Sequence, residues 1–90
     1  MKYELDISDD ALSQIAYFKK SDKQSFKKIE KLLVELADHP FMGTGHPEEL
    51  KGDYSGYWSR KVNKKDRLIY KVQEEEVIVF VLSTKGHYND

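Results

Sequence analysis

The 90-residue sequence contains no cysteine. A disulfide framework and a thiolate metal site both require cysteine, so the sequence excludes both. Its three histidines, His39, His46 and His87, lack the spacing that metal ligands show. We therefore predict a protein that holds no metal and needs no cofactor.

Long apolar segments are also absent. No stretch approaches the roughly 20 apolar residues that a membrane-spanning helix needs, and no apolar segment of the kind found in secretion signals follows Met1. We expect a cytoplasmic protein with no membrane partner. Ninety residues suffice for one modest hydrophobic core, so we predict a single domain over residues 1–90.

The net charge of −1 conceals an uneven distribution. Residues 51–71 contain seven basic residues against two acidic ones, a local charge of +5. The same segment has strand-like composition, with Trp58, Val62, Leu68 and Tyr70 as apolar anchors. Clustered basic side chains bind phosphates, because each neutralised phosphate releases counterions. The segment therefore predicts RNA or another phosphate-bearing molecule as the partner.

The first forty residues have the pattern of a strand followed by two helices. Residues 1–7 alternate between polar and apolar side chains, which is typical of a half-buried strand. Apolar residues recur three and four apart in residues 9–20 and again in residues 22–38, which predicts two helices. Pro40 ends the second helix, because proline disfavours helix at the preceding residue. The polar side of that helix carries Lys23, Lys27, Lys31 and Glu35.

The second half of the chain has the pattern of a loop followed by three strands. Residues 41–52 contain three of the five glycines, so we predict a loop. Residues 54–62, 66–72 and 76–83 have strand composition, and the last is apolar enough for a buried strand. The order β-α-α-β-β-β predicts an α+β fold, with a two-helix hairpin packed on one face of a mostly antiparallel, twisted sheet.

Four motifs occur in a specific order along the chain: Pro40-Phe41-x-Gly-x-Gly-x-Pro-Glu before Leu50-Lys51, then Ser55-Gly56-Tyr57-Trp58-Ser59-Arg60, Arg67-Leu68-Ile69-Tyr70 and His87-Tyr88. Together they resemble the YoeB toxins (Txe/YoeB family), a branch of the RelE/ParE toxin superfamily of bacterial type II toxin–antitoxin systems. The resemblance spans nearly the whole chain and implies a RelE-like fold.

The resemblance also implies an activity, partners and site residues. Members of the family are endoribonucleases that cleave mRNA in the A site of the 70S ribosome and are silenced by a YefM/Phd-type antitoxin, and a homodimer using aromatics such as Trp58 is expected. Lys61 stands where the family commonly has a second arginine, so it keeps the charge but loses the planar guanidinium fork. The implied catalytic residues are Glu48, Arg67, His87 and Tyr88, and the implied phosphate-binding residues are Lys51, Arg60 and Lys61.

These residue types suit metal-independent RNA cleavage. The 2′-hydroxyl of RNA is the nucleophile, so the reaction needs a general base, positive charge for the phosphorane-like transition state, and an acid for the leaving 5′-oxygen. Glu48 is the candidate base, Arg60 and Arg67 the candidate phosphate contacts, and His87 the candidate acid. Tyr88 is suited to stacking on a base or orienting the phosphate.

Other interpretations of the same residues remain. On pattern alone, Glu48 is a solvated loop acid, Arg60 and Arg67 form exposed cross-strand pairs with Asp66 or Glu75, and His87 is a terminal bystander. Two other functions also fit the fold class. One is a ParE-like toxin that poisons a different target such as gyrase, and the other is a catalytically silent RNA-binding or antitoxin-docking module.

Overall fold

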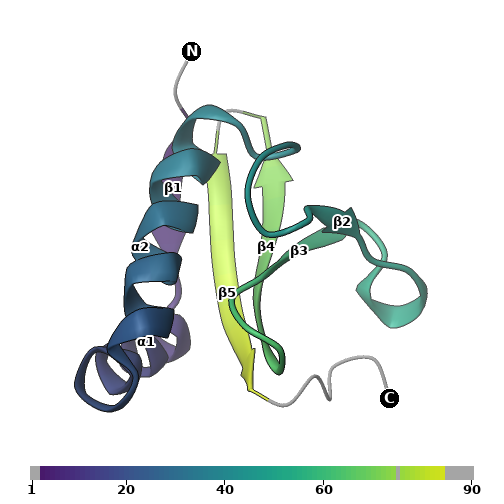
Figure 1. The fold of residues 1–90 in the computed structure, drawn as a ribbon. Helices are drawn as coiled ribbons and strands as arrows, with labels where there is room; N and C mark the ends of the chain where they lie inside the picture. Colours follow the sequence, from purple (N-terminus) through teal and green to yellow (C-terminus); the bar gives the residue numbers. More distant parts are fainter. Residues whose placement is uncertain (1–2, 75, 85–90) are drawn as a thin grey trace.

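The computed structural model describes residues 3–74 and 76–84. Two helices pack against a five-stranded sheet, which confirms the predicted α+β fold (Figure 1). The sheet order is β1-β5-β4-β3-β2, with β1 parallel to β5 and the other neighbours antiparallel. The elements are β1 (Glu4–Ile7), α1 (Asp9–Ser21), α2 (Lys23–Asp38), β2 (Glu48–Glu49), the 3₁₀ turn η1 (Gly52–Tyr54), β3 (Tyr57–Lys61), β4 (Asp66–Gln73) and β5 (Glu76–Thr84).

Side-chain caps set the helix boundaries. The Ser8 side chain accepts a hydrogen bond from the Ala11 N–H (3.1 Å) and begins α1. Asp22 has two roles: its N–H donates to the Phe18 carbonyl at the end of α1, and its carboxylate accepts from the Ser25 N–H at the start of α2. Each bond satisfies a backbone group that a helix end leaves unpaired. The two helices therefore meet at one residue, Asp22, whereas the sequence pattern placed this residue inside the second helix.

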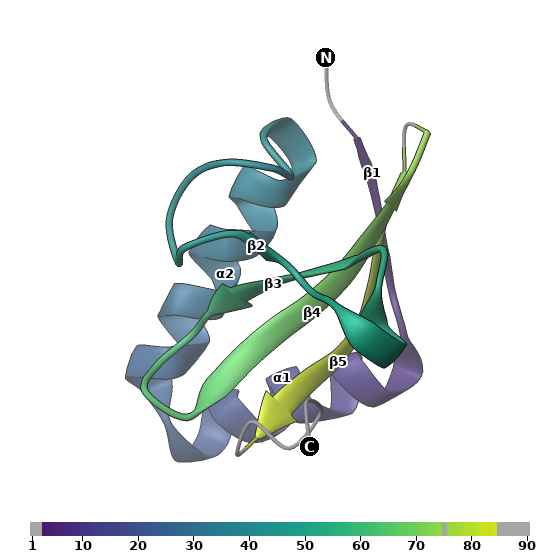
Figure 2. The same cartoon turned by 90° about the vertical axis from the view of Figure 1, so that its right-hand side faces the viewer.

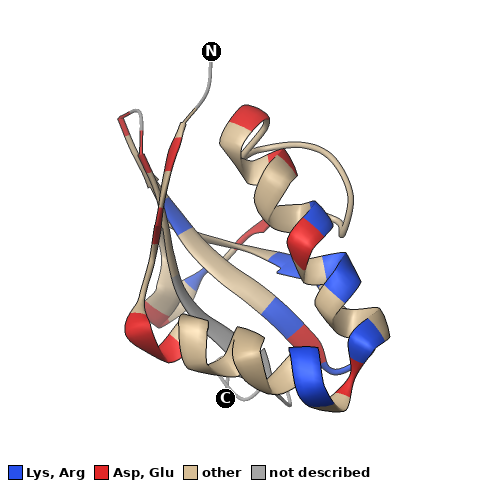
Figure 3. Cartoon of the chain, turned by 90° about the vertical axis from the view of Figure 1, so that its left-hand side faces the viewer, with Lys and Arg blue, Asp and Glu red and all other residues tan. Residues whose placement is uncertain are grey.

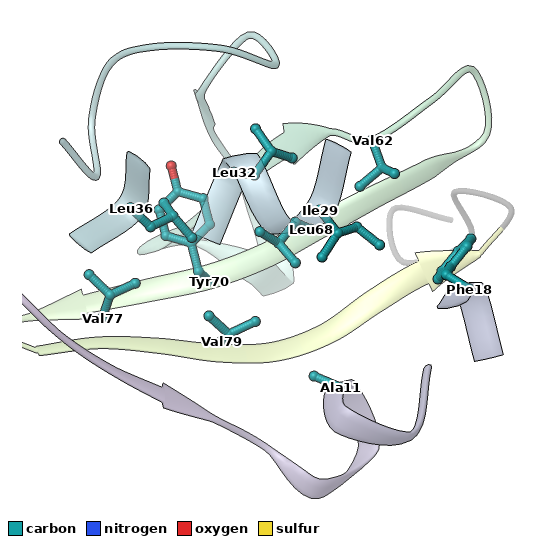
Figure 4. Close-up of a cluster of buried hydrophobic side chains, with 10 residues drawn as sticks. All are labelled: Ala11, Phe18, Ile29, Leu32, Leu36, Val62, Leu68, Tyr70, Val77 and Val79. Carbon is teal, nitrogen blue, oxygen red and sulfur yellow. The ribbon is translucent and has the colours of Figure 1, made fainter. Parts of the chain in front are cut away.

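The hydrophobic core lies between the helices and the sheet (Figure 4). Ile29, Leu32 and Leu36 on α2 are fully buried, and their spacing of three and four keeps them on one side of the helix. Of the lysines of α2, Lys23, Lys27 and Lys31 are exposed and Lys28 is half-buried; Figure 3 marks their positions along the helix in blue. The rest of the buried cluster is Ala11, Phe18, Val62, Leu68, Tyr70, Val77 and Val79.

The strand register decides which side chains of β3 and β4 face the helices. Arg60 lies opposite Leu68, and Lys61 lies opposite Arg67. Successive side chains of a strand point to opposite faces of the sheet. Leu68 belongs to the core beneath α2, so Arg60 points toward the helices, whereas Lys61 and Arg67 point to the other side. We call that other side the helix-free face.

Two parts of the predicted loop and strand pattern were wrong. The segment 41–52, predicted as a loop, contains β2, whose two residues pair with Ser59 and Trp58 of β3. The segment predicted as one strand from 54 to 62 is divided: η1 comes first, and the strand begins only at Tyr57. Gly56 separates the two with a φ of 94°, a conformation that a regular strand does not contain.

Candidate functional site

The helix-free face collects three of the candidate residues. Glu48 of β2 lies opposite Ser59 of β3, two positions from Lys61, and Lys61 lies opposite Arg67 of β4. Neighbouring strands are about 4.8 Å apart, so the three residues occupy one area of three adjacent strands. Glu48 and Lys61 are exposed and Arg67 is half-buried, which leaves all three side chains accessible. One carboxylate and two cations thus share a solvent-facing surface.

Further residues extend this area. Lys71 lies on the same face as Arg67, and its ammonium nitrogen is 5.6 Å from the ring centroid of Tyr57. Lys51 is exposed and lies just beyond β2, at the start of η1. The Leu50 N–H donates to the Tyr57 carbonyl (2.8 Å), which holds the start of this segment against β3. Basic side chains therefore flank Glu48 on two sides: those of β3 and β4 on one side, and Lys51 beyond the end of β2 on the other.

Arg60 has a different environment. Its side chain is 0% exposed, beneath the segment that connects α2 to β2. Guanidinium carries five N–H donors, and five acceptors surround this one. They are the Tyr70 hydroxyl (3.3 Å from Nε), Glu35 Oε1 (3.0 Å from Nη1), the Thr44 carbonyl (3.4 Å from Nη1), the Met42 carbonyl (2.8 Å from Nη2) and the His39 carbonyl, which also accepts from Nη2.

This geometry does not fit the predicted phosphate contact of Arg60. The guanidinium is enclosed and its donors already have acceptors, so it offers nothing to a substrate phosphate. The predicted exposed charge pair does not fit either, because the salt-bridge partner of Arg60 is Glu35 of α2. The physical reason is the strand register. Arg60 of β3 lies opposite Leu68 of β4, so both side chains point to the same face of the sheet, and Leu68 belongs to the core.

Glu35 binds Arg60, a contact that the sequence analysis did not predict. Its side chain is 23% exposed and binds Arg60, although the helical pattern assigned it to the polar side of α2. The Thr44 hydroxyl donates to Glu35 Oε2 (2.7 Å) and the Thr44 N–H to Glu35 Oε1 (2.8 Å). The hydroxyl bond, aided by the N–H bond and by Arg60 and opposed by partial burial, holds the pKa of Glu35 below its ordinary value of 4.5.

Tyr70 completes the same cluster. Its hydroxyl donates to the Pro40 carbonyl (2.6 Å) and accepts from Arg60. Burial raises the pKa of the Tyr70 phenol above its ordinary value of 10.0, and Arg60 partly offsets this. At neutral pH the hydroxyl therefore keeps its proton, and it both donates and accepts a hydrogen bond. We call Glu35, Thr44, Arg60 and Tyr70 the Arg60 cluster.

The connecting segment 40–47 runs from the end of α2 to β2 (Figure 2), and the Arg60 cluster is hydrogen-bonded to its backbone. Two glycines allow the close approach. A Cβ on Gly43 would come within 2.5 Å of Glu35 Oε1, and a Cβ on Gly45 within 3.0 Å of the Lys61 carbonyl. Both have positive φ, 126° and 87°, which favours glycine. The glycines of the first motif are therefore explained by contact with the cluster.

A second polar cluster fixes the turn between β3 and β4. The Asn63 side-chain oxygen accepts from the backbone N–H groups of Lys65 and Asp66, and its amide nitrogen donates to Asp66 and to the Ser25 hydroxyl (2.8 Å). The Ser25 hydroxyl in turn donates to Asp22, and this bond lowers the pKa of Asp22 below its ordinary value of 3.8. The turn before Arg67 is thus tied to the start of α2.

The remaining predicted residues lie beyond what the structure describes. His87 and Tyr88, the candidate acid and its neighbour, fall outside the described residues. Within residues 3–74 and 76–84, no group of three or more histidine, cysteine, aspartate or glutamate side chains is arranged to hold a metal ion. In the same part of the chain, no helix is long and apolar enough to cross a membrane.

Known proteins resemble this chain in both sequence and fold. The model of the family described as the YoeB-like toxin of bacterial type II toxin-antitoxin systems matches residues 7–88. A toxin YoeB from Streptomyces coelicolor is 39% identical over 72 residues, which are 80% of this chain and 83% of that protein.

Solved structures with the same fold include close sequence relatives. A YoeB/ParE toxin from Agrobacterium tumefaciens has a TM-score of 0.85 and 30% identity, with 94% of this chain and 99% of that chain covered. A YoeB dimer from Staphylococcus aureus has a TM-score of 0.79 and 34% identity, and a YoeB-YefM complex from the same organism 0.80 and 30%, each covering 98% of this chain and 100% of its own. The chain therefore belongs to the YoeB-like toxin family of bacterial type II toxin–antitoxin systems.

Proposed function

We propose that this toxin is a ribosome-dependent endoribonuclease that cleaves mRNA in the A site and so inhibits translation. One observation carries the proposal: Glu48, Lys61 and Arg67 share the accessible helix-free face. RNA cleavage by the 2′-hydroxyl needs a base and concentrated positive charge, and these side chains supply both. Membership of the YoeB-like family supports the same chemistry.

The proposed mechanism assigns one role to each group. Glu48 takes the proton of the 2′-hydroxyl, which attacks the adjacent phosphorus. Arg67 and Lys61 neutralise the charge that develops on the non-bridging oxygens, and Lys51 binds a neighbouring phosphate. His87 protonates the leaving 5′-oxygen and Tyr88 orients the substrate; these two roles rest on the family resemblance alone. No metal ion takes part, and the products are a 2′,3′-cyclic phosphate and a 5′-hydroxyl.

The proposed partners follow from the same surface. The segment 51–71 carries a charge of +5, so an inhibitor must bring acidic residues to it. We propose a YefM/Phd-type antitoxin whose binding segment becomes ordered on the toxin, and a homodimer in the free state. A YoeB-YefM complex and a YoeB dimer are among the related structures from Staphylococcus aureus. Co-purification from the native operon and sedimentation of the free toxin test these two partners.

A pair of adjacent glutamates offers a sharp test of the enzymatic activity. Glu48 and Glu49 are both exposed and carry the same charge, but they pair with Ser59 and Trp58 and so point to opposite sides of the sheet. We expect Glu48→Gln to slow single-turnover cleavage of mRNA on programmed ribosomes by about 10²–10⁴-fold, the usual contribution of a positioned base. Glu49→Gln should stay within about threefold of the parent.

Three outcomes count against the proposal. Equal rates for both variants mean that Glu48 is not the base. Inhibition of growth without any cleavage of ribosome-bound mRNA favours a ParE-like action on another target. Binding to ribosomes with neither cleavage nor growth inhibition favours a silent RNA-binding module.

A further inference from the structure

The ion pair between buried Arg60 and half-buried Glu35 requires an explanation, because it does not touch the helix-free face. Removing charges from water is costly, and well-packed apolar residues often stabilise a fold as well as a buried ion pair does. Arg60 directs three of its bonds to backbone carbonyls, those of His39, Met42 and Thr44. These carbonyls all belong to the end of α2 and the segment that follows it. The main effect of Arg60 is therefore to fix the path of this segment.

The other members of the Arg60 cluster bind the same segment. Glu35 receives both the N–H and the hydroxyl of Thr44, and Tyr70 donates to the Pro40 carbonyl. The Lys61 N–H donates to the Gly45 carbonyl (2.6 Å), which joins the segment to β3 next to Arg60. From Pro40 to Gly45, the segment is thus held by side chains of α2, β3 and β4.

This segment leads directly to Glu48. β2 has only two residues, so it contributes few hydrogen bonds of its own and depends on the chain at either end. Lys61 connects the segment to the helix-free face. Its backbone N–H donates to the Gly45 carbonyl, and its side chain lies on that face beside Arg67. A shift of the segment would move Glu48 relative to Lys61 and Arg67.

We propose that Glu35, Thr44, Arg60 and Tyr70 form a positioning cluster that holds Glu48 in its place relative to Arg67 and Lys61. The cluster touches no substrate and acts only through Glu48. The proposal has two halves. The catalytic half, that the position of Glu48 affects the rate, rests on the proposed function, whereas the structural half, that the cluster holds the segment leading to Glu48, is independent of any activity. Misplacement of a reacting group by about 1 Å can slow a reaction about 10²-fold, so such a cluster has a measurable effect on rate.

Hydrogen exchange tests the structural half. Substitution of the fully buried Arg60 is expected to destabilise the whole protein, so Glu35 is the better position for a test variant. Its side chain is 23% exposed, and it accepts the N–H of Thr44. In Glu35→Ala, we expect the backbone amides of Thr44 and Lys61 to exchange faster, while the amide of Val77 in the core keeps its protection. Glu35→Gln keeps an oxygen acceptor and should restore part of the protection. Glu30→Ala, at an exposed position on the same helix, is the matched control.

A double-mutant cycle tests the catalytic half. We expect Glu35→Ala to lower the single-turnover rate at saturating ribosomes about 10- to 100-fold, with half-saturation unchanged, and Glu35→Gln to recover part of the loss. In a Glu48→Gln background, Glu35→Ala should change the rate less than threefold, because the group that the cluster positions is already gone.

Two results overturn the proposal. One is unchanged exchange at Thr44 and Lys61 in Glu35→Ala. The other is an equally large rate loss from Glu35→Ala with and without Glu48→Gln, which identifies a general effect of destabilisation. If the parent protein cleaves no ribosome-bound mRNA, the proposed function fails, whereas the exchange experiment still decides whether the cluster holds the segment.

Discussion

Arg60 and Lys61 are adjacent in the sequence and carry the same charge, yet they occupy opposite environments. Arg60 is fully buried with an acceptor for each of its five donors, whereas Lys61 is exposed on the helix-free face opposite Arg67. The alternation of side chains along β3 causes the difference. A basic cluster in the sequence therefore contains two kinds of residue: buried ones that shape the protein and exposed ones that are accessible to a partner.

The two sides of the sheet should respond differently to mutation. On the helix side, removal of one group leaves its partners buried without hydrogen bonds, and the free energy of unfolding falls. On the helix-free face, removal of a side chain leaves the remaining groups in water, so stability changes little while binding and catalysis change.

The largest effect on stability is expected at Arg60. Arg60→Met removes the guanidinium, which leaves the carbonyls of the connecting segment without this donor and Glu35 without its cation. We therefore expect a loss of about 3–5 kcal/mol in the free energy of unfolding. Lys61→Met, the adjacent exposed position, should stay within about 0.5 kcal/mol of the parent. Urea unfolding followed by circular dichroism measures both. Similar losses at the two positions would contradict the division between the two sides.

A large effect on activity without loss of stability is expected at Arg67, as at Glu48. Loss of one electrostatic contact to a transition state typically costs about 10²–10³-fold in rate, and we expect this for Arg67→Ala in single-turnover cleavage. Lys64→Ala removes a positive charge from the exposed turn nearby and should slow cleavage less than about fivefold. A comparable loss in the two variants would mean that only the total charge matters.

A smaller difference in stability is expected between alanine substitutions at two glycines with positive φ, Gly45 and Gly52. Gly45→Ala introduces a Cβ within 3.0 Å of the Lys61 carbonyl and 3.2 Å of Leu32 Cδ2 at a φ of 87°. We expect it to cost about 2–3 kcal/mol, from backbone strain and crowding together. Gly52→Ala has the same sign of φ, 70°, but meets nothing within 4 Å, so only the backbone cost of about 1 kcal/mol applies. Equal destabilisation would show that the contact with the cluster is unimportant.

The smallest expected effect is the pH dependence of stability that Glu35 contributes. Its pKa is lowered in the folded protein, so the folded state binds this proton less readily than the unfolded state. The ionised carboxylate therefore stabilises the fold fully above its ordinary pKa of 4.5, and this stability disappears as the pH falls through the folded value.

Glu35→Gln provides the comparison for this effect. The difference in unfolding free energy between the parent and Glu35→Gln should be largest near pH 7 and should shrink below about pH 4.5. The pKa of Asp22 is lowered as well, but Asp22 is present in both proteins and cancels in the difference. A difference that is constant from pH 7 to pH 3 would rule out the ionised Glu35 as the source.

Much of the fold could be predicted from the sequence, because periodic patterns report burial directly. The helices begin and end within a few residues of the predicted bounds, and the strand order along the chain was correct except for β2. β2 was missed because two polar residues in a glycine-rich segment carry no strand pattern. It exists only because β3 offers it backbone partners, which is information from the tertiary structure.

The burial of Arg60 left a signal that the sequence analysis did not use. Trp58 and Val62 were assigned as apolar anchors, and Arg60 lies between them at the same alternation of the strand. The interpretation of Arg60 as a phosphate contact relied on its charge and ignored its position in the strand. Glu35 gave a similar signal, because it lies between the core residues Leu32 and Leu36 on α2. A charged residue at a core position predicts a partner, although the sequence alone does not identify which one.

The most direct test of the central claim removes a single oxygen atom from the substrate. In the proposed reaction the 2′-hydroxyl of the mRNA attacks its own phosphate, so an mRNA with one 2′-deoxynucleotide at the scissile position of the A-site codon offers no nucleophile. Single-turnover cleavage by the parent protein should be abolished at that bond, while the matched all-RNA message is cleaved. Cleavage of the deoxy-substituted message at the parent rate would show that water or another nucleophile attacks, and would contradict the account.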